Sequence, residues 1–210
     1  MKLLVATRSA HKMQEIRQIL VEVPDLEVLS LDDAGVEPSP EEERLEPHDT
    51  FLENARSKAR YFQRRTGLPT VADDSGLEVD ALDGRPGVRS KRFAQDDGAA
   101  DQVLDGQPRD DANNRHLVRL LADVPPEDRT ARYVCVAVLL DGEREVAVRG
   151  EAEGRVVDEA RGCGGFGYDP HILVPELEVT YAELDAEAKN ARSHRGRAFR
   201  ALAERLRGEG

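Results

Sequence analysis

Hydrophobic and polar positions follow two alternating periods along the chain, and these periods predict interleaved β-strands and α-helices. Residues 2–6 form an apolar run that predicts a buried strand, and the apolar positions between His11 and Val23 recur at helical spacing. The same patterns predict strands at 28–31, 70–72, 132–140, 145–149 and 172–174, an alternating segment at 77–82, and helices at 50–67, 111–123 and 193–207. Because these elements interleave without a repeat, we expect an α/β fold with a mixed β-sheet.

Capping and turn residues mark the ends of several elements. Thr50 and Glu53 have the spacing of a capping box at a helix start, and Gly67 suits the position just past its end. Asp141-Gly142, between two apolar segments, is the strongest short hairpin signal in the chain. No linker-like stretch divides the sequence, so we expect residues 1–210 to form a single domain.

The charge balance limits the classes of partner. The 42 acidic and 30 basic side chains give a net charge of −12, which argues against a general nucleic-acid-binding protein. The longest apolar run, Tyr133–Leu140, is far shorter than the roughly 20 residues that span a bilayer, so we expect no membrane partner. Cys135 and Cys163 match neither a disulfide framework nor a CxxC metal site. These features predict a soluble protein of a reducing compartment.

The turn between the first predicted strand and helix is the first candidate for chemistry. It consists of Thr7, Arg8, Ser9, Ala10, His11 and Lys12. A helix N-terminus offers free N–H groups and a partial positive charge, and the Lys12 ammonium can reach the same anion. The alternative is an ordinary N-cap serine followed by an exposed lysine, and the sequence leaves both open.

Two adjacent carboxylates follow the strand predicted at 70–72. In the segment Asp73-Asp74-Ser75-Gly76 they point to opposite faces of an extended chain, so only one is expected to enter a binding cleft. A carboxylate at the carboxyl end of a strand can bind Mg²⁺ and orient or deprotonate a water molecule. A turn with Asx-type hydrogen bonds accounts for the same residues equally well.

A glycine-rich segment, residues 162–170, carries Phe166, Gly167, Tyr168 and Asp169. Its spacing matches GxGxxG, but a strand signal follows it instead of a helix, so we reject a dinucleotide-binding βαβ unit. We expect a flexible loop that presents two aromatic rings and one acid to a flat ligand. The alternative places Phe166 in the core.

Lysines are concentrated in these motifs. Arginine outnumbers lysine by 25 to 5, yet Lys12 and Lys189 both lie within motifs chosen for other reasons. His194 and Arg195 occupy the first turn of the last predicted helix, where cations oppose the helix dipole unless an anion compensates them. A solvated charge run is the alternative there. Focused cations and a stacking ring in an acidic protein favour a nucleotide site over a general polyanion surface.

Taken together, these motifs resemble the HAM1/RdgB family of inosine and xanthosine triphosphate pyrophosphatases. The matching segments occur in the family's order between residues 2 and 202. They are Thr7–Lys12, Thr50–Ala55, Ala72–Leu77, Gly84–Val88, Asn113-Asn114 with Leu117, Phe166–Pro170 and Ser193–Gly196. Four features depart from the family pattern. Ser9 stands where Asn is usual, and Arg8 stands where Gly is frequent. The loop before Thr50 is longer, and His171-Ile172-Leu173 stands where residues like Ile-Phe-Phe are commoner.

The resemblance implies an elongated, two-lobed α/β fold around a long mixed sheet flanked by helices, with the nucleotide in a cleft between the lobes. It implies Mg²⁺-dependent hydrolysis of ITP, dITP or XTP to the nucleoside monophosphate and pyrophosphate, which cleanses the nucleotide pool. It also implies a cytoplasmic homodimer that binds a small-molecule nucleoside triphosphate and neither nucleic acid nor membrane.

The resemblance further implies roles for matching residues of this chain. Asp74 would be the general base or a metal-bound carboxylate. A second metal ligand would come from the acidic loop, where Glu46 aligns best and Glu41, Glu42 and Glu43 compete. The implied phosphate ligands are Lys12, Ser75 and Lys189, with Thr7 and Ser9 at the first turn. The implied base-binding residues are Phe166, which stacks, and Asp169, His194 and Arg195, which read the edge.

Substrate choice follows from the base edge, since a 6-oxo purine presents an acceptor where adenine presents a donor. An Arg195 donor left unpaired by ATP would cost about 1–3 kcal/mol.

Three other functions compete with this one. The segments at 166–170 and 193–196 argue against a Maf-like pyrophosphatase, and Asp74 argues against a sensor that binds without turnover. The convergence of so many polar motifs argues against a scaffold.

Overall fold

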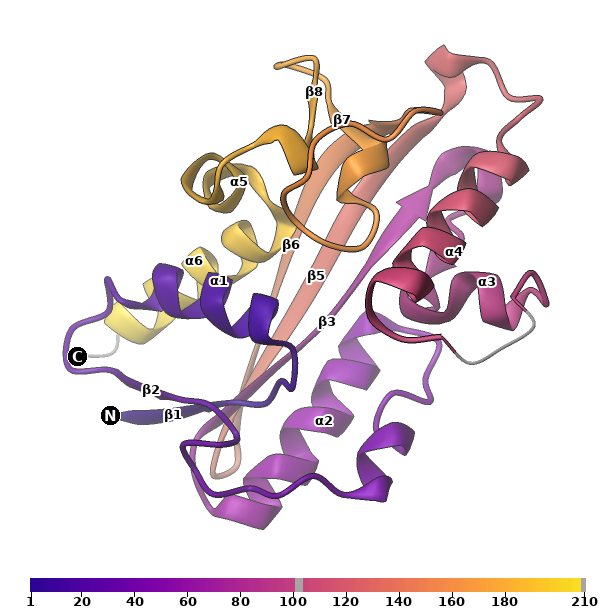
Figure 1. Cartoon of the computed structure of the whole chain (residues 1–210). Coiled ribbons are helices and arrows are strands. Elements are labelled where there is room, and N and C mark those ends of the chain that lie inside the picture. Colours follow the sequence, from indigo (N-terminus) through magenta and orange to yellow (C-terminus); the bar gives the residue numbers. More distant parts are fainter. Residues whose placement is uncertain (101–103, 209–210) are drawn as a thin grey trace. The chain divides into compact units, whose positions relative to one another are not determined.

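The computed structural model describes residues 1–100 and 104–208, and strands and helices interleave along the chain as expected (Figure 1). The strands are β1 (Lys2–Val5), β2 (Glu27–Leu29), β3 (Thr70–Val79), β4 (Pro86–Gly87), β5 (Thr130–Asp141), β6 (Arg144–Val156), β7 (Ile172–Val174) and β8 (Val179–Thr180). The α-helices are α1 (Ala10–Leu20), α2 (Phe51–Thr66), α3 (Phe93–Asp96), α4 (Gly106–Leu120), α5 (Ala186–Arg192) and α6 (His194–Arg207).

The described strands form one mixed sheet, which confirms the predicted α/β class. Their order is β2-β1-β3-β5-β6-β7-β8, and β4 pairs with β3. Strand β1 is parallel to both neighbours, with Leu4 opposite Leu29 and Thr70, whereas β7 pairs antiparallel with β6 and β8. Because β1 and β3 are parallel neighbours, the turn after β1 lies near the part of β3 that follows Val71.

The chain divides into two compact units, each assembled from segments that are distant in sequence. Unit 1 comprises Met1–Ser75, Cys135–Gly150 and Ser193–Gly210, and unit 2 comprises Gly76–Val134 and Glu151–Arg192. The expectation of a single two-lobed domain stays a prediction.

In unit 1, α1 and α6 pack side by side (Figure 1). Ile16 of α1 and Phe199 of α6 are fully buried in one apolar core with Val5 of β1. Ser9 and Ser193 cap the two helices, because each side chain accepts a backbone N–H three residues on. Local caps and a shared apolar core therefore fix the start of each helix beside the sheet.

Helix α2, also in unit 1, has the ends that the sequence predicts. The Thr50 hydroxyl accepts the Glu53 N–H at the start, and Gly67 ends the helix in the left-handed region, with φ of 68°. Phe51, Ala55, Ala59 and Phe62 form its buried side.

In unit 2, α4 and the loop after β6 share an apolar core. Leu117 of α4 packs in this core with Phe93, Tyr168 and Ile172. Asn113 of α4 joins the helix to the chain before it, since its side chain accepts the Ala94 N–H and donates to the Ser90 and Lys91 carbonyls.

Several elements differ from the prediction in extent. Helix α4 begins at Gly106 instead of residue 111, and β6 runs to Val156 instead of residue 149. Part of the acidic loop forms a 3₁₀ helix, Pro40–Arg44, which Ser39 caps. Helix α5 has no counterpart in the prediction. These boundaries depend on partners far along the chain, which local patterns do not report.

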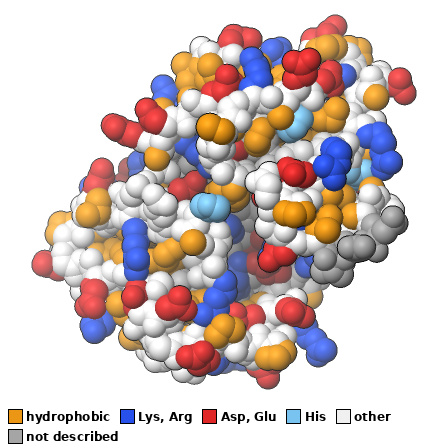
Figure 2. Space-filling view, viewed as in Figure 1, with side chains coloured by type: hydrophobic (Ala, Val, Ile, Leu, Met, Phe, Trp, Pro, Cys, Tyr) orange, Lys and Arg blue, Asp and Glu red, His pale blue; other side chains and the backbone are white. Residues whose placement is uncertain are grey.

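Acidic and basic side chains are interspersed over the face shown in Figure 2. No helix within the described residues is long and apolar enough to cross a bilayer. Cys135 is buried and Cys163 is exposed, and both are free thiols.

Candidate active site

Asp73 and Asp74 lie inside β3, which continues through both residues to Val79. Asp73 contacts α1 and α6, whereas Asp74 contacts α2. The interpretation of this segment as a turn is therefore wrong, and the expected separation of the two carboxylates onto opposite faces is confirmed.

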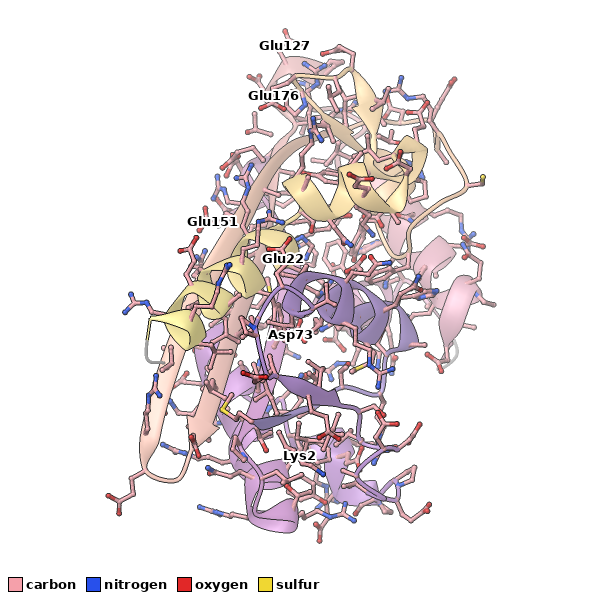
Figure 3. All side chains as sticks on the ribbon, turned by 90° about the vertical axis from the view of Figure 1, so that its left-hand side faces the viewer. Lys2, Glu22, Asp73, Glu127, Glu151 and Glu176 are labelled. Carbon is pink, nitrogen blue, oxygen red and sulfur yellow. The ribbon has the colours of Figure 1, made fainter. Side chains whose placement is uncertain are left out.

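Asp73 is the centre of a buried ion network. Its Oδ2 atom accepts hydrogen bonds from Lys12 Nζ at 2.9 Å and Ser75 Oγ at 2.7 Å, and lies 3.6 Å from Arg195 Nε. Figure 3 shows Asp73 beside α1, the helix that carries Lys12. Burial disfavours the charged carboxylate, but Lys12 and Arg195 outweigh that effect and hold the pKa of Asp73 well below its usual range.

Arg195 belongs to the same network. Its side chain is only 2% exposed, and Nη1 donates to Glu15 Oε2 at 2.5 Å while Nη2 lies 3.4 Å from Ser75 Oγ. Burial lowers the pKa of this guanidinium, but Asp73 and Glu15 together raise it above its usual range. The alternative, a solvated charge run at the start of α6, is wrong for Arg195, and the anions that compensate this cation are the protein's own carboxylates, Glu15 and Asp73.

Asp74 has the environment of a proton acceptor that works near neutral pH. Its Oδ2 atom accepts from Asn54 Nδ2 at 3.0 Å, and its Oδ1 atom accepts from the Ser75 N–H at 3.0 Å. Burial raises the pKa of the Asp74 carboxyl to about 6; Lys58 opposes this rise, and the Glu46 carboxylate adds to it. A carboxylate with this pKa is mostly ionised at pH 7 and can still take a proton from a reacting water.

Glu46 is the acidic-loop residue that interacts electrostatically with Asp74. It forms an ion pair with Lys58 of α2. Burial raises the pKa of Glu46, but the Lys58 ammonium more than offsets that, so the pKa falls below its usual value. Asn54 and Lys58 lie four residues apart on one face of α2. Asn54 donates to the Asp74 carboxylate, and Lys58 donates to the Glu46 carboxylate.

Two of the three competing glutamates have other partners. Glu42 accepts from Arg8 Nη2 at 2.9 Å and Nε at 3.0 Å, and Glu41 accepts from Tyr61 at 3.2 Å. Glu43 is exposed. These contacts favour Glu46 over the other three, and its role as a metal ligand stays a prediction.

Asp74 and Glu46 fit a cation that shares its ligands with a substrate. Residues 1–100 and 104–208 contain no group of three or more His, Cys, Asp or Glu side chains that could hold a metal ion. Mg²⁺ usually takes one or two carboxylates and completes its shell with water and substrate phosphates. A cation beside these two carboxylates would also relieve the repulsion that raises the pKa of Asp74.

The turn after β1 has the expected N-cap. The Ser9 hydroxyl accepts the Lys12 N–H at 3.3 Å, and the Ser9 N–H donates to Thr7 Oγ1 at 3.2 Å. Ala10 and His11 begin α1. Lys12 is not the exposed lysine of the alternative, because it is paired with Asp73. The substrate-binding roles predicted for residues 7–12 stay predictions, and Arg8 is held by Glu42.

In unit 2, Lys189, Asp169 and Phe166 form a second polar cluster. Lys189 Nζ donates to Asp169 Oδ2 at 2.8 Å and lies 4.7 Å from the centroid of the Phe166 ring. Asp169 also accepts from the Tyr133 hydroxyl at 3.0 Å and the Phe166 N–H at 2.9 Å. Phe166 is half-buried, as expected of a ring that the loop presents. Lys189, predicted as a phosphate ligand, therefore contacts two residues predicted for the base.

Tyr168 differs from the expectation of a second presented ring. It is 6% exposed, packs in the core of unit 2, and donates its hydroxyl proton to the Ser90 carbonyl at 2.8 Å. The loop presents one aromatic ring, Phe166, because the apolar core already takes the other.

Helix α4 holds the backbone next to Phe166 through two side chains. Asp110 Oδ2 accepts the Gly167 N–H at 3.0 Å, and Asn114 Nδ2, one helical turn later, donates to the Gly167 carbonyl at 2.9 Å. Both residues are buried, and Asn114 Oδ1 has no hydrogen-bond partner in the part of the chain that the structure describes. This two-point contact fixes the residue that follows the stacking ring.

The sequence-predicted residues divide between the units. Unit 1 holds residues 7–12, Glu46, Asp74, Ser75, His194 and Arg195, and unit 2 holds residues 166–169 and Lys189. Glu15, Asp110 and Tyr133 are contacts that the sequence analysis missed. Helical spacing could have indicated two of them, since Glu15 lies three residues after Lys12 and Asp110 four before Asn114. Nothing in the apolar run marks Tyr133.

The fold and site define an α/β protein with an acid–base site built for an anionic ligand. The chain belongs to the Ham1 family, whose family model matches residues 3–205. It is 46% identical to the dITP/XTP pyrophosphatase of Thioalkalivibrio sulfidiphilus, over 99% of this chain and 100% of that protein. It is 45% identical to that of Geobacter sulfurreducens, over 100% and 98%.

Solved structures agree with this assignment. A HAM1 protein from Coxiella burnetii aligns with a TM-score of 0.83 and 33% identity over 100% of both chains. A nucleoside-triphosphatase, dITP/XTP pyrophosphatase, from Mycobacterium abscessus aligns with a TM-score of 0.71 and 40% identity over 96% of this chain and 98% of that one.

Proposed function

We propose that this chain hydrolyses the non-standard purine nucleotides ITP, dITP and XTP to the nucleoside monophosphate and pyrophosphate. The observation that carries the proposal is Asp74, a buried carboxyl with a pKa raised to about 6 among ordered polar groups. The full-length similarity to proteins named dITP/XTP pyrophosphatases supports the substrate class.

Asp74 acts as the general base in this scheme. A water oxygen bonds to the α-phosphorus while Asp74 takes one proton of that water. The bond between the α-phosphorus and the α–β bridging oxygen breaks, and pyrophosphate leaves with the electron pair. Asn54 orients the Asp74 carboxylate by its 3.0 Å hydrogen bond, so the base is positioned before the substrate arrives.

Cationic groups of unit 1 bind the phosphates. Lys12 is held beside the start of α1 by its hydrogen bond to Asp73, and its ammonium has two further protons to donate. Ser75 and the positive end of the α1 dipole complete the set. Fixed donors of this kind stabilise the charge that develops on phosphoryl oxygens.

Asp74 and Glu46 are the residues that would hold Mg²⁺. The ion would supply charge neutralisation at the phosphates, which attack by water on an anionic phosphoryl group requires. Lys58 is placed to keep Glu46 ionised, because it lowers the pKa of that carboxyl.

The unit 2 cluster recognises the base. Phe166 stacks on the purine, and the Lys189 ammonium that lies on this ring moves to a phosphate oxygen when the base arrives. The family resemblance assigns the base edge to Asp169 of this cluster and to His194 and Arg195 of unit 1. A donor facing O6 would be left unpaired by the amino group of ATP, which disfavours ATP by about 1–3 kcal/mol.

The family resemblance also supports a cytoplasmic homodimer. Sedimentation velocity at micromolar concentration measures this directly, with a mass of twice 23.2 kDa as the expected result.

Substitution of the base tests the proposal. Asp74→Asn keeps the shape of the side chain, and we expect turnover of ITP with Mg²⁺ to fall by roughly 10²- to 10⁴-fold, the usual contribution of a general base. Asp123→Asn, at an exposed position on the surface, is the matched control. If Asp74→Asn folds normally and retains most of the activity, the assignment of Asp74 is wrong.

A further inference from the structure

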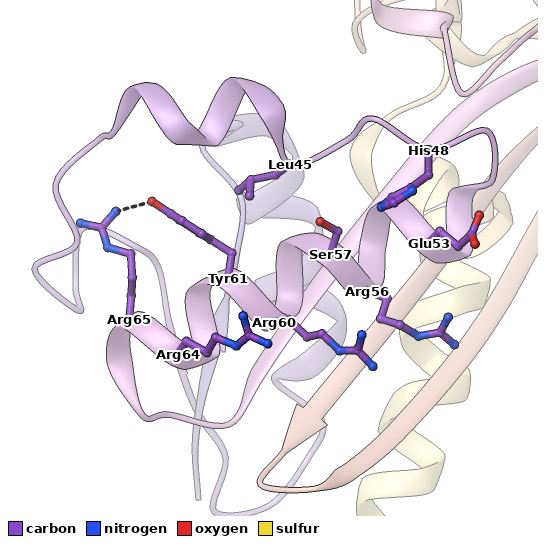
Figure 4. Close-up of a pocket in the computed structure, with 9 residues that line it drawn as sticks. All are labelled: Leu45, His48, Glu53, Arg56, Ser57, Arg60, Tyr61, Arg64 and Arg65. Carbon is purple, nitrogen blue, oxygen red and sulfur yellow. Dashed lines mark hydrogen bonds between the residues drawn. The ribbon is translucent and has the colours of Figure 1, made fainter.

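The outer side of α2 carries a pocket that the proposed reaction does not use. The pocket has a volume of about 590 Å³, within the range of small-molecule sites. Figure 4 shows Arg56, Arg60 and Arg64 in a row along the helix, with Arg65 and Tyr61 at the end of the row. Four arginines and one glutamate, Glu53, thus line one pocket in a protein with a net charge of −12.

The protein neutralises part of this charge, and Arg65 lies 3.7 Å from Glu42 Oε1. Arg56 makes a bidentate pair with Glu145, from Nη2 to Oε1 at 2.7 Å and from Nε to Oε2 at 3.0 Å, and Arg60 reaches the same carboxylate only at 3.8 Å. The Arg64 side chain has no hydrogen-bond or ion-pair partner within residues 1–100 and 104–208. One carboxylate thus serves two of the three arginines in the row.

The helix itself does not account for the arginine row. Cations in the last turn stabilise a helix dipole, which explains Arg64 and Arg65. Arg56 and Arg60 lie further from the end, and like charges four residues apart destabilise a helix. An anion bound among these side chains would reverse the sign of that interaction.

The pocket offers more than charge. Tyr61 and Leu45 give it an apolar wall, and Arg65 donates to the Tyr61 hydroxyl at 3.2 Å while its guanidinium lies 5.7 Å from the ring centroid. Guanidinium groups bind phosphoryl oxygens in a bidentate manner, which a single ammonium cannot do. A wall with one aromatic ring and several guanidinium groups suits a small phosphorylated molecule.

This pocket is separate from the residues assigned to hydrolysis. Asn54 and Lys58 face Asp74 and Glu46 from the inner side of α2. Arg60 and Arg64, at six and ten residues after Asn54, point to the other side of the helix and are exposed. A ligand in the pocket would therefore not compete with a substrate held at Asp74.

We propose that the pocket is a second anion site, which binds a small molecule bearing two or more phosphoryl charges. Pyrophosphate is the simplest such molecule and serves as the probe. The site stands independently of the proposed hydrolysis, because none of the residues that line the pocket is assigned to that reaction.

Isothermal titration of the magnesium-free protein with pyrophosphate tests the proposal. We expect two binding events in the wild type: one that Lys12→Met removes, and one that the double variant Arg60→Gln/Arg64→Gln weakens by about tenfold or more. Arg205→Gln/Arg207→Gln removes two exposed arginines from the last turns of α6 and is the matched control. Thermal unfolding of each variant shows whether it is folded.

The outcomes distinguish the two proposals. If the Arg60/Arg64 variant binds with the stoichiometry and affinity of the Arg205/Arg207 control, the second site does not exist. If Lys12→Met changes nothing while the Arg60/Arg64 variant loses an event, the second site stands and the phosphate role of Lys12 fails. Tighter binding of citrate than of pyrophosphate at the second site would overturn the assignment to phosphoryl groups.

Discussion

Gly165 offers a sharp test of how the glycine loop positions the base-binding residues. A Cβ atom added at Gly165 would lie 2.2 Å from Asp169 Oδ2 and 2.9 Å from Asp169 Cγ. Ordinary contact begins at 3.4 Å, so the carboxylate must move by about 1.2 Å, the difference between 3.4 and 2.2 Å. Asp169 holds Lys189 at 2.8 Å and the Phe166 N–H at 2.9 Å, and a shift of this size breaks both hydrogen bonds.

The expected loss has two separable parts. Gly165 has φ of +71°, and a non-glycine residue in the left-handed region costs about 1–2 kcal/mol. A hydrogen bond to a charged group contributes about 1.5–3 kcal/mol, so displacing Asp169 from Lys189 adds about that amount. If this second part appears in substrate binding, the KM for ITP rises about tenfold to hundredfold.

Gly167→Ala is the matched control. Gly167 lies in the same loop with φ of +64°, and no atom lies within 4 Å of the Cβ position there. Both variants should lose similar stability through backbone strain, measured by thermal unfolding, and only Gly165→Ala should show the large increase in KM. Equal KM values for the two variants would refute the claim that Asp169 positions the base-binding cluster.

Three further predictions concern positioning, stability and metal binding. Asn114→Ala removes the donor to the Gly167 carbonyl. We expect the KM for ITP to rise about fivefold with kcat retained, because a net hydrogen bond is worth about 1 kcal/mol. A fall in kcat alone would argue against a role of Asn114 in positioning the Phe166 loop. The folded-state pKa of Asp73 lies below its unfolded value, so the stability from its ionisation is present above about pH 4 and is lost as the pH falls below that. Urea unfolding from pH 6 to pH 2 should show a free energy of unfolding that falls with pH in the wild type and falls less steeply in Asp73→Asn. Parallel slopes would contradict this prediction. Glu46→Gln should raise the Mg²⁺ concentration for half-maximal activity severalfold. Glu42→Gln, at a carboxylate that Arg8 binds, should leave this concentration unchanged. A larger effect of Glu42→Gln than of Glu46→Gln would reassign the metal ligand.

Local signals in the sequence predict much of the fold. Ser9 and Thr50 cap the helices that follow them, as the sequence indicates, and the hairpin predicted at Asp141-Gly142 joins β5 to β6 through Gly142 and Glu143. These features depend on residues a few positions apart, and a cap or turn needs no distant partner to form.

The course of β3 depends on distant residues, and sequence patterns miss it. Asp-Asp-Ser-Gly is typical of a turn, because carboxylates in a buried strand are costly unless they are paired. Lys12 and Arg195 supply that pairing for Asp73 from the two ends of the chain. The strand therefore continues through Asp73, although local preference predicts a break.

Parts of the candidate site were missed for the same reason. Asp110 has the appearance of a surface residue on a charged helix. Its carboxylate instead accepts the N–H of Gly167, which lies in the glycine-rich loop 57 residues later in the chain. Tyr168 appears in the sequence as a second presented ring, and only the packing of unit 2 shows that the core takes it. Residue types indicated the chemistry, and the tertiary contacts determined which side chains are available for it.

A product assay tests the central claim most directly. ITP, XTP, GTP and ATP are each incubated with the protein with and without Mg²⁺, and pyrophosphate and inorganic phosphate are quantified separately. The account predicts Mg²⁺-dependent release of pyrophosphate from ITP and XTP, with ATP largely unused. Release of inorganic phosphate, or equal use of ATP, would contradict both the attack at the α-phosphorus and the selection of the 6-oxo base.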